Sequence, residues 1–141
     1  MTTHDELAAY QALGLAKARY CRAIDTKDWA MLSGLMLEEV EFGMANDDAT
    51  ADMIVGRTSV IESLQQLTAG ARTVHQVYNP EIELSGDEAR VVWAVQDHAV
   101  YDNGFSVTGY GHYFERWMRV DDGWRVASVL LRHLIVDTAS G

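Results

Sequence analysis

The stretch of sequence that decides the fold is Ala89-Arg90-Val91-Val92-Trp93-Ala94-Val95-Gln96-Asp97-His98-Ala99-Val100-Tyr101. Alternate residues of an extended chain share one face, and from Ala89 onward that face is apolar or aromatic except at Asp97. Turn signals bound the stretch, with Ser85-Gly86-Asp87 before it and Asp102-Asn103-Gly104 after it. The pattern predicts a long strand with one buried face, on which Asp97 is the residue that needs an explanation.

The segments on either side of this stretch are also predicted to be strands. Turn residues bound them and apolar residues recur along them, over 73–78, 81–84, 107–120 and 124–136. Asn79-Pro80 separates the first two, and Asp121-Asp122-Gly123 separates the last two. The last strand is apolar on both faces, so we expect helices on one face and a second subunit on the other. This predicts a homodimer.

The N-terminal half of the chain is predicted to be mainly helical. Thr3 and Glu6 have the spacing of a capping box and open a long amphipathic helix that ends near Asp25. A second helix follows over 28–36, and a third lies between Thr58 and Gly70. The pattern predicts a short strand over 40–44 and a loop over 45–52.

Composition limits the partners and the compartment. A chain of 141 residues fits one domain, 1–141, with a real core. Its 11 Lys+Arg against 21 Asp+Glu give a net charge of −10, which disfavours nucleic acid and anionic membranes as partners. The single Cys21 excludes an internal disulfide. No basic-then-apolar N-terminus and no membrane-length apolar run are present, so we expect a cytoplasmic protein.

The order of the predicted elements indicates the fold class. Helices and one strand come first, and strands joined by tight turns follow, which is typical of an α+β fold. We expect a strongly curved antiparallel or mixed sheet wrapped around the N-terminal helices. Such a sheet encloses an internal apolar pocket, which suits a small hydrophobic organic ligand.

The same segments resemble the SnoaL-like branch of the cone-shaped nuclear transport factor 2-like superfamily. The resemblance covers nearly the whole chain and is carried by Tyr20 and Asp25 in the first helix and by three later segments. These are Thr73-Val74-His75, the run from Ala89 to Asp97, and Gly109-Tyr110-Gly111-His112-Tyr113 with the following Gly123-Trp124-Arg125-Val126. The branch contains dehydratases and dehydrochlorinases that eliminate water or halide without a cofactor, so the resemblance implies no cofactor here.

The resemblance implies a catalytic pair, His75 and Asp25. In these enzymes a histidine on the strand after the third helix pairs with an aspartate near the end of the first. A histidine with a pKa near 6.5 suits proton abstraction at neutral pH. Asp25 would accept the Nδ1–H of His75, fix its tautomer and stabilise the imidazolium.

Three further residues are implied as catalytic by the same resemblance: Tyr20, Asp97 and Arg132. Tyr20 would polarise a carbonyl or protonate a leaving oxygen. The apolar surroundings of Asp97 would raise its pKa and make it a proton donor. Arg132 is the nearest match to a late arginine, and His133 would face the opposite side of the strand. Alternation alone leaves open which of the two faces the cavity.

Three aromatic residues are predicted to line the pocket: Phe42, Trp93 and Tyr113. Tyr113 shares a strand face with Gly109 and Gly111, whose small size leaves room for a ligand. An ordinary core role is the alternative for Trp93 and Tyr113.

The candidate catalytic residues also have structural interpretations. A strand histidine such as His75 is often structural, and Asp25 alone could be only a helix-end carboxylate. Asp97 could instead pair with Arg90 or Arg116.

A metal site and the remaining candidates carry less weight. A site made of His75, His112 and Asp97 would lack a helical histidine pair or a cysteine cluster, so we expect no metal. His98 and His112 are expected outside the pocket, and Cys21 is expected to be buried packing.

The function that these residues favour is a cofactor-independent lyase. We expect a dehydratase that acts on a small hydrophobic cyclic or steroid-like substrate through His75 and Asp25. An isomerase or polyketide cyclase of the same fold would use the same pair. A non-catalytic ligand-binding or dimerisation module is the alternative from another class.

Overall fold

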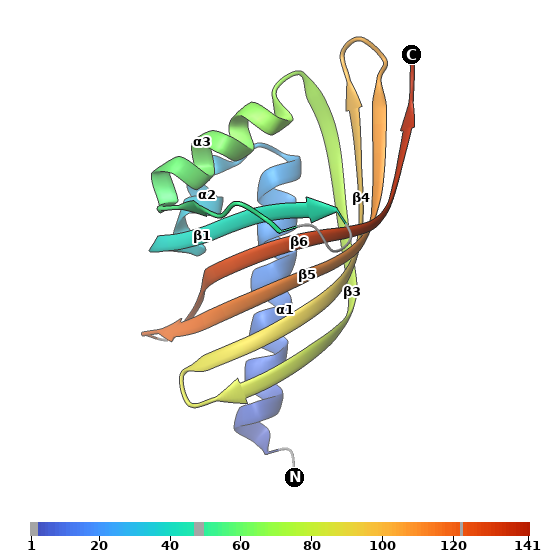
Figure 1. Cartoon of the computed structure of the whole chain (residues 1–141). Helices are drawn as coiled ribbons and strands as arrows, with labels where there is room; N and C mark the ends of the chain where they lie inside the picture. Colours follow the sequence, from blue (N-terminus) through green and yellow to red (C-terminus); the bar gives the residue numbers. More distant parts are fainter. Residues whose placement is uncertain (1–2, 47–49, 122) are drawn as a thin grey trace.

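The chain forms a curved six-stranded sheet that wraps around its N-terminal helices (Figure 1). A computed structural model describes residues 3–46, 50–121 and 123–141. The helices are α1 (His4–Asp25), α2 (Trp29–Gly34) and α3 (Arg57–Thr68). The strands are β1 (Met36–Asn46), β2 (Ile54–Val55), β3 (Ala71–Ser85), β4 (Glu88–Tyr101), β5 (Ser106–Val120) and β6 (Gly123–Ala139).

The sheet is mixed and open, with the strand order β2-β1-β6-β5-β4-β3. β1 runs parallel to β6, and the other neighbours are antiparallel. The α+β fold class and the curved sheet are therefore as predicted, and β4 contains the alternating stretch from which they were inferred. Its inward residues have exposed fractions of 3% or less at Ala89, Val91, Trp93 and Val95.

Helix α1 positions one side of the site because its apolar face packs into the concave side of the sheet. The Thr3 hydroxyl accepts a hydrogen bond from the Glu6 amide at 3.2 Å, so the predicted N-cap is present. The buried stripe then runs from Leu13 through Ala16 and Tyr20 to Ile24, at spacings of three and four residues typical of one helix face. Asp25 is the last helical residue, which brings its carboxylate to the edge of the sheet.

Two predicted strands form one strand in the structure. Strand β3 continues through Asn79-Pro80, with a register shift against β4 between Tyr78 and Glu81. Asn79 has φ of +52°, which asparagine tolerates better than most residues. Proline also fits at a bulge, because an unpaired position needs no amide hydrogen.

The second helix is shorter than predicted and the strand after it is longer. α2 ends at Gly34, and Met36 begins β1, where it lies opposite Val126 of β6. β1 also includes residues 45–46 of the predicted loop, because pairing with β6 supplies backbone partners that the local pattern does not contain. β2 was not predicted, and residues 47–49 of the predicted loop lie outside the described residues.

The C-terminal part of β6 carries exposed apolar side chains. The exposed fractions are 62% at Leu134, 56% at Ile135 and 41% at Val136. The predicted homodimer would cover such a surface, and it stays a prediction. None of the described helices is long and apolar enough to cross a membrane.

Candidate active site

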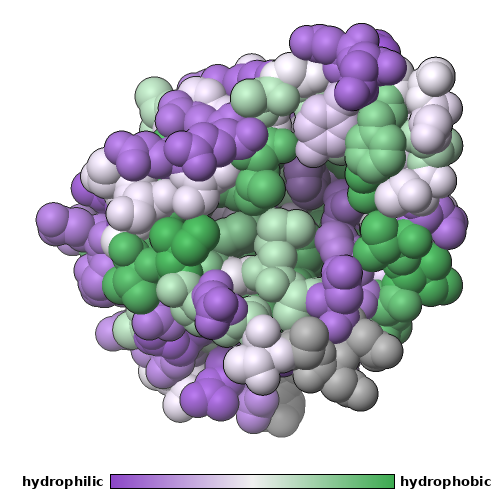
Figure 2. Space-filling view, turned by 45° about the horizontal axis from the view of Figure 1, so that its top comes forward, coloured by the Kyte–Doolittle hydropathy of each residue, from purple (hydrophilic) through white to green (hydrophobic). Residues whose placement is uncertain are grey.

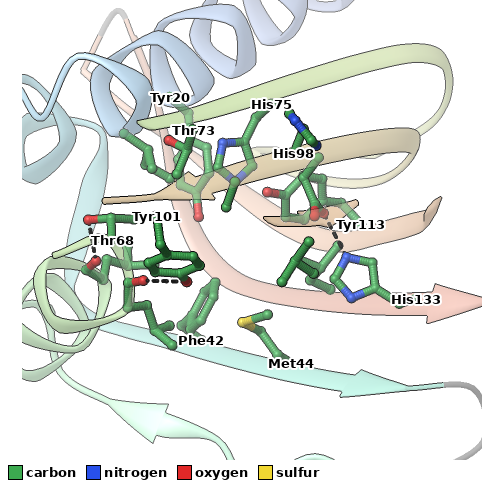
Figure 3. Close-up of a pocket in the computed structure, with 17 residues that line it drawn as sticks. Tyr20, Phe42, Met44, Thr68, Thr73, His75, His98, Tyr101, Tyr113 and His133 are labelled. Carbon is green, nitrogen blue, oxygen red and sulfur yellow. Dashed lines mark hydrogen bonds and ion pairs between the residues drawn. The ribbon is translucent and has the colours of Figure 1, made fainter. Parts of the chain in front are cut away.

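A largely apolar cavity of about 150 Å³ lies between the sheet and helices α1 and α3. Figure 2 shows the hollowed face of the molecule, with hydrophobic and hydrophilic residues around the hollow. Its apolar lining includes Ile24, Leu64 and Leu131. Most of the polar side chains on its wall are the tyrosines and histidines labelled in Figure 3, which come from α1 and from four strands of the sheet.

The predicted pair of His75 and Asp25 is present at this cavity. The His75 Nδ1 lies 2.7 Å from Asp25 Oδ1, and the side chains are 14% and 20% exposed. The His75 backbone amide donates to Asp25 Oδ2 at 2.9 Å, and the Thr73 hydroxyl donates to Oδ1 at 2.9 Å. Three donors therefore hold the carboxylate, which is more than a solvated helix end would need. When Nδ1–H is donated to Asp25, His75 keeps Nε2 as a proton acceptor.

Asp25 itself stands behind His75 rather than in the cavity wall. His75 lines both the cavity and a neighbouring surface depression, whereas Asp25 lines only the depression. The arrangement follows from local structure, because Asp25 ends α1 while Thr73 and His75 occupy alternate positions of β3. Asp25 can therefore orient the imidazole while only His75 contacts a ligand.

Tyr20 lines the cavity with a hydroxyl that lacks a protein partner. Its side chain is fully buried, and its oxygen is the one buried side-chain polar atom of the described residues without a hydrogen bond. Burial, with a further contribution from Glu115, raises the pKa of Tyr20 well above its usual value. The phenol therefore stays protonated and can donate to a ligand oxygen.

Strand β6 presents His133, and not Arg132, to the cavity. Leu131 and His133 alternate on the wall, which places Arg132 on the other face of the strand. His133 Nε2 lies 2.6 Å from Asp97 Oδ2, so Asp97 pairs with His133 rather than with Arg90 or Arg116. The structure does not bring Arg132 to the predicted site. The alternation left open which of the two neighbours faces the cavity, and His133 is the one that does.

Two of the three predicted pocket aromatics line the cavity. Phe42 and Tyr113 belong to its wall, and the Tyr113 and Tyr20 rings meet edge to face with centroids 6.3 Å apart. Trp93 is absent from the described lining because its indole Nε1 donates at 2.8 Å to the buried Glu115. Trp93 is therefore a core residue behind the wall.

A buried ion pair beneath the tyrosines was not predicted from the sequence. Lys17 Nζ donates to Glu115 Oε2, and both side chains are fully buried. The ammonium lies 3.9 Å from the centroid of the Tyr20 ring and 3.5 Å from that of Tyr113, within the range of cation–π attraction. Glu115 Oε1 also accepts from the indole of Trp117 at 2.8 Å. The sequence signal for this pair was a charged residue on the apolar face of an element, Lys17 in α1 and Glu115 in β5. The same kind of signal identified Asp97.

The remaining histidines and the cysteine have different surroundings. His98 borders the cavity, contrary to prediction, and its Nδ1 lies 2.7 Å from Thr108 Oγ1. His112 is not part of the described lining, as predicted. Cys21 is buried, and burial raises its pKa to about 11, which fits a packing role. No three His, Cys, Asp or Glu side chains among the described residues are grouped to hold a metal ion.

Comparisons with solved structures agree with the fold. A scytalone dehydratase-like protein of Novosphingobium aromaticivorans has 23% sequence identity and a TM-score of 0.84, over 96% of this chain and 91% of the other. The hexachlorocyclohexane dehydrochlorinase LinA-type3 of Novosphingobium barchaimii has 15% identity and a TM-score of 0.82, over 97% and 94% of the two chains. Similarity at this level of identity shows a shared fold.

Sequence comparisons identify the family. The chain is 28% identical over 136 residues to "Probable cyclase FGR4" of Gibberella zeae, which covers 84% of this chain and 86% of that protein. The family model for the SnoaL-like domain matches residues 5–129. The chain therefore belongs to the SnoaL-like domain family.

Proposed function

We propose that this protein is a cofactor-independent lyase of the dehydratase type, which removes a proton from carbon and expels a β-substituent from a small cyclic ketone. The observation that carries the proposal is the contact of 2.7 Å between His75 Nδ1 and Asp25 Oδ1 at the wall of an apolar cavity. Structural neighbours that include dehydratase-like and dehydrochlorinase proteins support the same chemistry.

The first step is proton abstraction by His75. Nε2 takes a proton from the carbon next to the carbonyl, and Asp25 stabilises the resulting imidazolium through Nδ1–H. The Tyr20 hydroxyl donates to the carbonyl oxygen, where negative charge develops as the proton leaves. The C–H electron pair then forms the new C=C bond as the β-substituent departs. These steps need a base and a hydrogen-bond donor, both of which are side chains of this chain.

The size of the cavity limits the substrate. An engineered protein cavity of about 150 Å³ holds a benzene molecule. The cavity here has about the same volume and is mainly lined by apolar residues. A substrate with one or two rings therefore fits better than the steroid-like alternative.

A cyclase is the second candidate function, because the curated relative at 28% identity carries that name. The same His75 and Asp25 would then abstract a proton to generate an enolate that attacks a carbonyl within the substrate. Water or halide would not be released in that reaction. Product analysis separates the two activities.

The test uses 3-hydroxy-1-tetralone, a two-ring ketone whose dehydration gives fluorescent 1-naphthol. Wild-type protein should accelerate naphthol formation, and His75→Gln should lower the rate by at least about 100-fold, the usual contribution of a general base. His112→Gln is the matched control, because His112 is outside the described lining. Equal rates for His75→Gln and wild type would contradict the proposal and leave ligand binding as the function.

A further inference from the structure

We infer that His133 is a second catalytic histidine, a general acid held by Asp97 that protonates the departing hydroxyl while His75 acts as the base. The inference rests on the proposed elimination and adds the group that completes it. Hydroxide is a poor leaving group, so a base alone does not account for loss of water. The cavity contains a second imidazole with its own carboxylate, on a different wall from the first (Figure 3).

The contact between His133 and Asp97 has the geometry of a catalytic pair. The Nε2–Oδ2 distance is 2.6 Å, the side chains are 8% and 16% exposed, and both residues line the cavity. Asp97 can only accept when ionised, so His133 Nε2 carries the hydrogen and Nδ1 is its second titrating position. The imidazolium form of His133, stabilised by Asp97, is a proton donor.

The surroundings of the two carboxylates assign the acid and base roles. Asp25 accepts from His75 Nδ1 and also from the Thr73 hydroxyl and the His75 amide, so its negative charge is shared among three donors. In the part of the chain that the structure describes, His133 is the one hydrogen-bond partner of the Asp97 carboxylate. The Asp97 carboxylate is therefore aimed at one imidazole alone, whereas the Asp25 carboxylate is also held by two donors that carry no titratable proton.

Gly109 is the position that makes this pair possible. Gly109 on β5 lies opposite Asp97 on β4, which in turn lies opposite His75 on β3. A Cβ atom on Gly109 would stand 2.6 Å from His133 Cδ2, closer still to Nε2, and 2.8 Å from Asp97 Oδ1. His133 therefore crosses the glycine of β5 to reach Asp97.

A strand irregularity helps to set this position. The register between β5 and β6 shifts after the Tyr110–Ile135 pair, so that Gly111 pairs with His133 and Leu134 is left as the extra residue. β-Bulges often re-aim side chains next to active sites. Here the alternation of buried and partly buried residues along β6 ends at His133, and the residues after it are exposed.

The completed reaction balances in protons and electrons. His75 takes the C–H proton, and the C–H electron pair becomes the second bond of the alkene. The C–O bond breaks with its pair on oxygen, which takes the His133 proton and leaves as water. His75 is then protonated and His133 is neutral, and proton exchange with water restores both.

The experiment compares leaving groups that differ in their need for a proton. His133→Gln should slow release of hydroxide from 3-hydroxy-1-tetralone by about 100-fold or more, and should change release of chloride from 3-chloro-1-tetralone by less than about threefold. Hydrogen–deuterium exchange at the carbon beside the carbonyl of 1-tetralone should be unchanged. His75→Gln should lower all three rates, and His112→Gln should lower none.

The pH profile is a readout that a purely structural role would not affect. Dehydration by the wild type should have a falling limb at high pH, and that limb should be absent from chloride release and from the residual dehydration by His133→Gln. Circular dichroism checks folding, and Asp97→Asn replaces His133→Gln if the latter does not fold. Equal losses for hydroxide and chloride, or no loss for either, would overturn the role of His133. Absence of all three activities in the wild type would instead overturn the proposed function and the inference with it.

Discussion

Replacement of Lys17 by methionine should lower the free energy of unfolding by about 3–5 kcal/mol, the usual cost of breaking a buried ion pair from one side. Methionine keeps most of the length of the lysine stem, so the substitution removes mainly the charge. The fully buried Glu115 would keep two indole donors, Trp93 and Trp117, each at 2.8 Å. Those two bonds do not replace an ammonium as counter-charge. The melting temperature should fall by roughly 10 °C or more.

Denaturation by urea and by heat measures this effect, and the other lysine of the chain provides the matched control. Lys27→Met at an exposed turn should stay within about 0.5 kcal/mol of the wild type. The double variant Lys17→Met/Glu115→Gln should be more stable than the sum of the single effects predicts, with a coupling of about 2 kcal/mol. If Lys17→Met costs no more than Lys27→Met, the buried ion pair does not contribute to the stability of the fold.

Three other substitutions or reagents test separate parts of the site. Tyr20→Phe removes a buried hydroxyl without a protein partner, so calorimetry should show unfolding free energy higher by about 1 kcal/mol while ketone turnover falls about 100-fold. Gly109→Ala should separate His133 from Asp97 and impair hydroxide release as strongly as His133→Gln, measured by naphthol formation. Cys21 has a pKa of about 11, so at pH 8 it is mainly the thiol, and its labelling by a disulfide reagent should be slow until the protein unfolds. Fast labelling of the folded protein would contradict its burial.

Local patterns were enough for most of the sheet, and the resemblance to the family supplied the pairing of His75 with Asp25. Alternation identified β4 with its inward Asp97, and the helical spacing placed Asp25 near the end of α1. These features depend on a single element or on the order of elements, which the sequence states directly.

The parts that escaped prediction depend on pairings between distant segments. Lys17 and Glu115 are 98 positions apart, and neither residue type indicates a buried partner by itself. Arg132 came from the resemblance, and alternation left open whether Arg132 or His133 faces the cavity, because it gives two strand faces but not which one is inside. The available signal for His133 was Gly109, because the His133 ring occupies the space that a side chain at position 109 would fill. Met36 joined a strand because β6 pairs with it, which overrides the local helical pattern.

The central claim is that His75, oriented by Asp25, removes a proton from carbon. Exchange of the hydrogens beside the carbonyl of 1-tetralone in heavy water, followed by NMR, measures that step without any leaving group. The wild type should exchange these hydrogens well above the uncatalysed rate, and His75→Gln should exchange them no faster than the uncatalysed rate. Asp25→Asn should exchange them more slowly than the wild type by about 100-fold or more. Exchange by His75→Gln at the wild-type rate would contradict the claim.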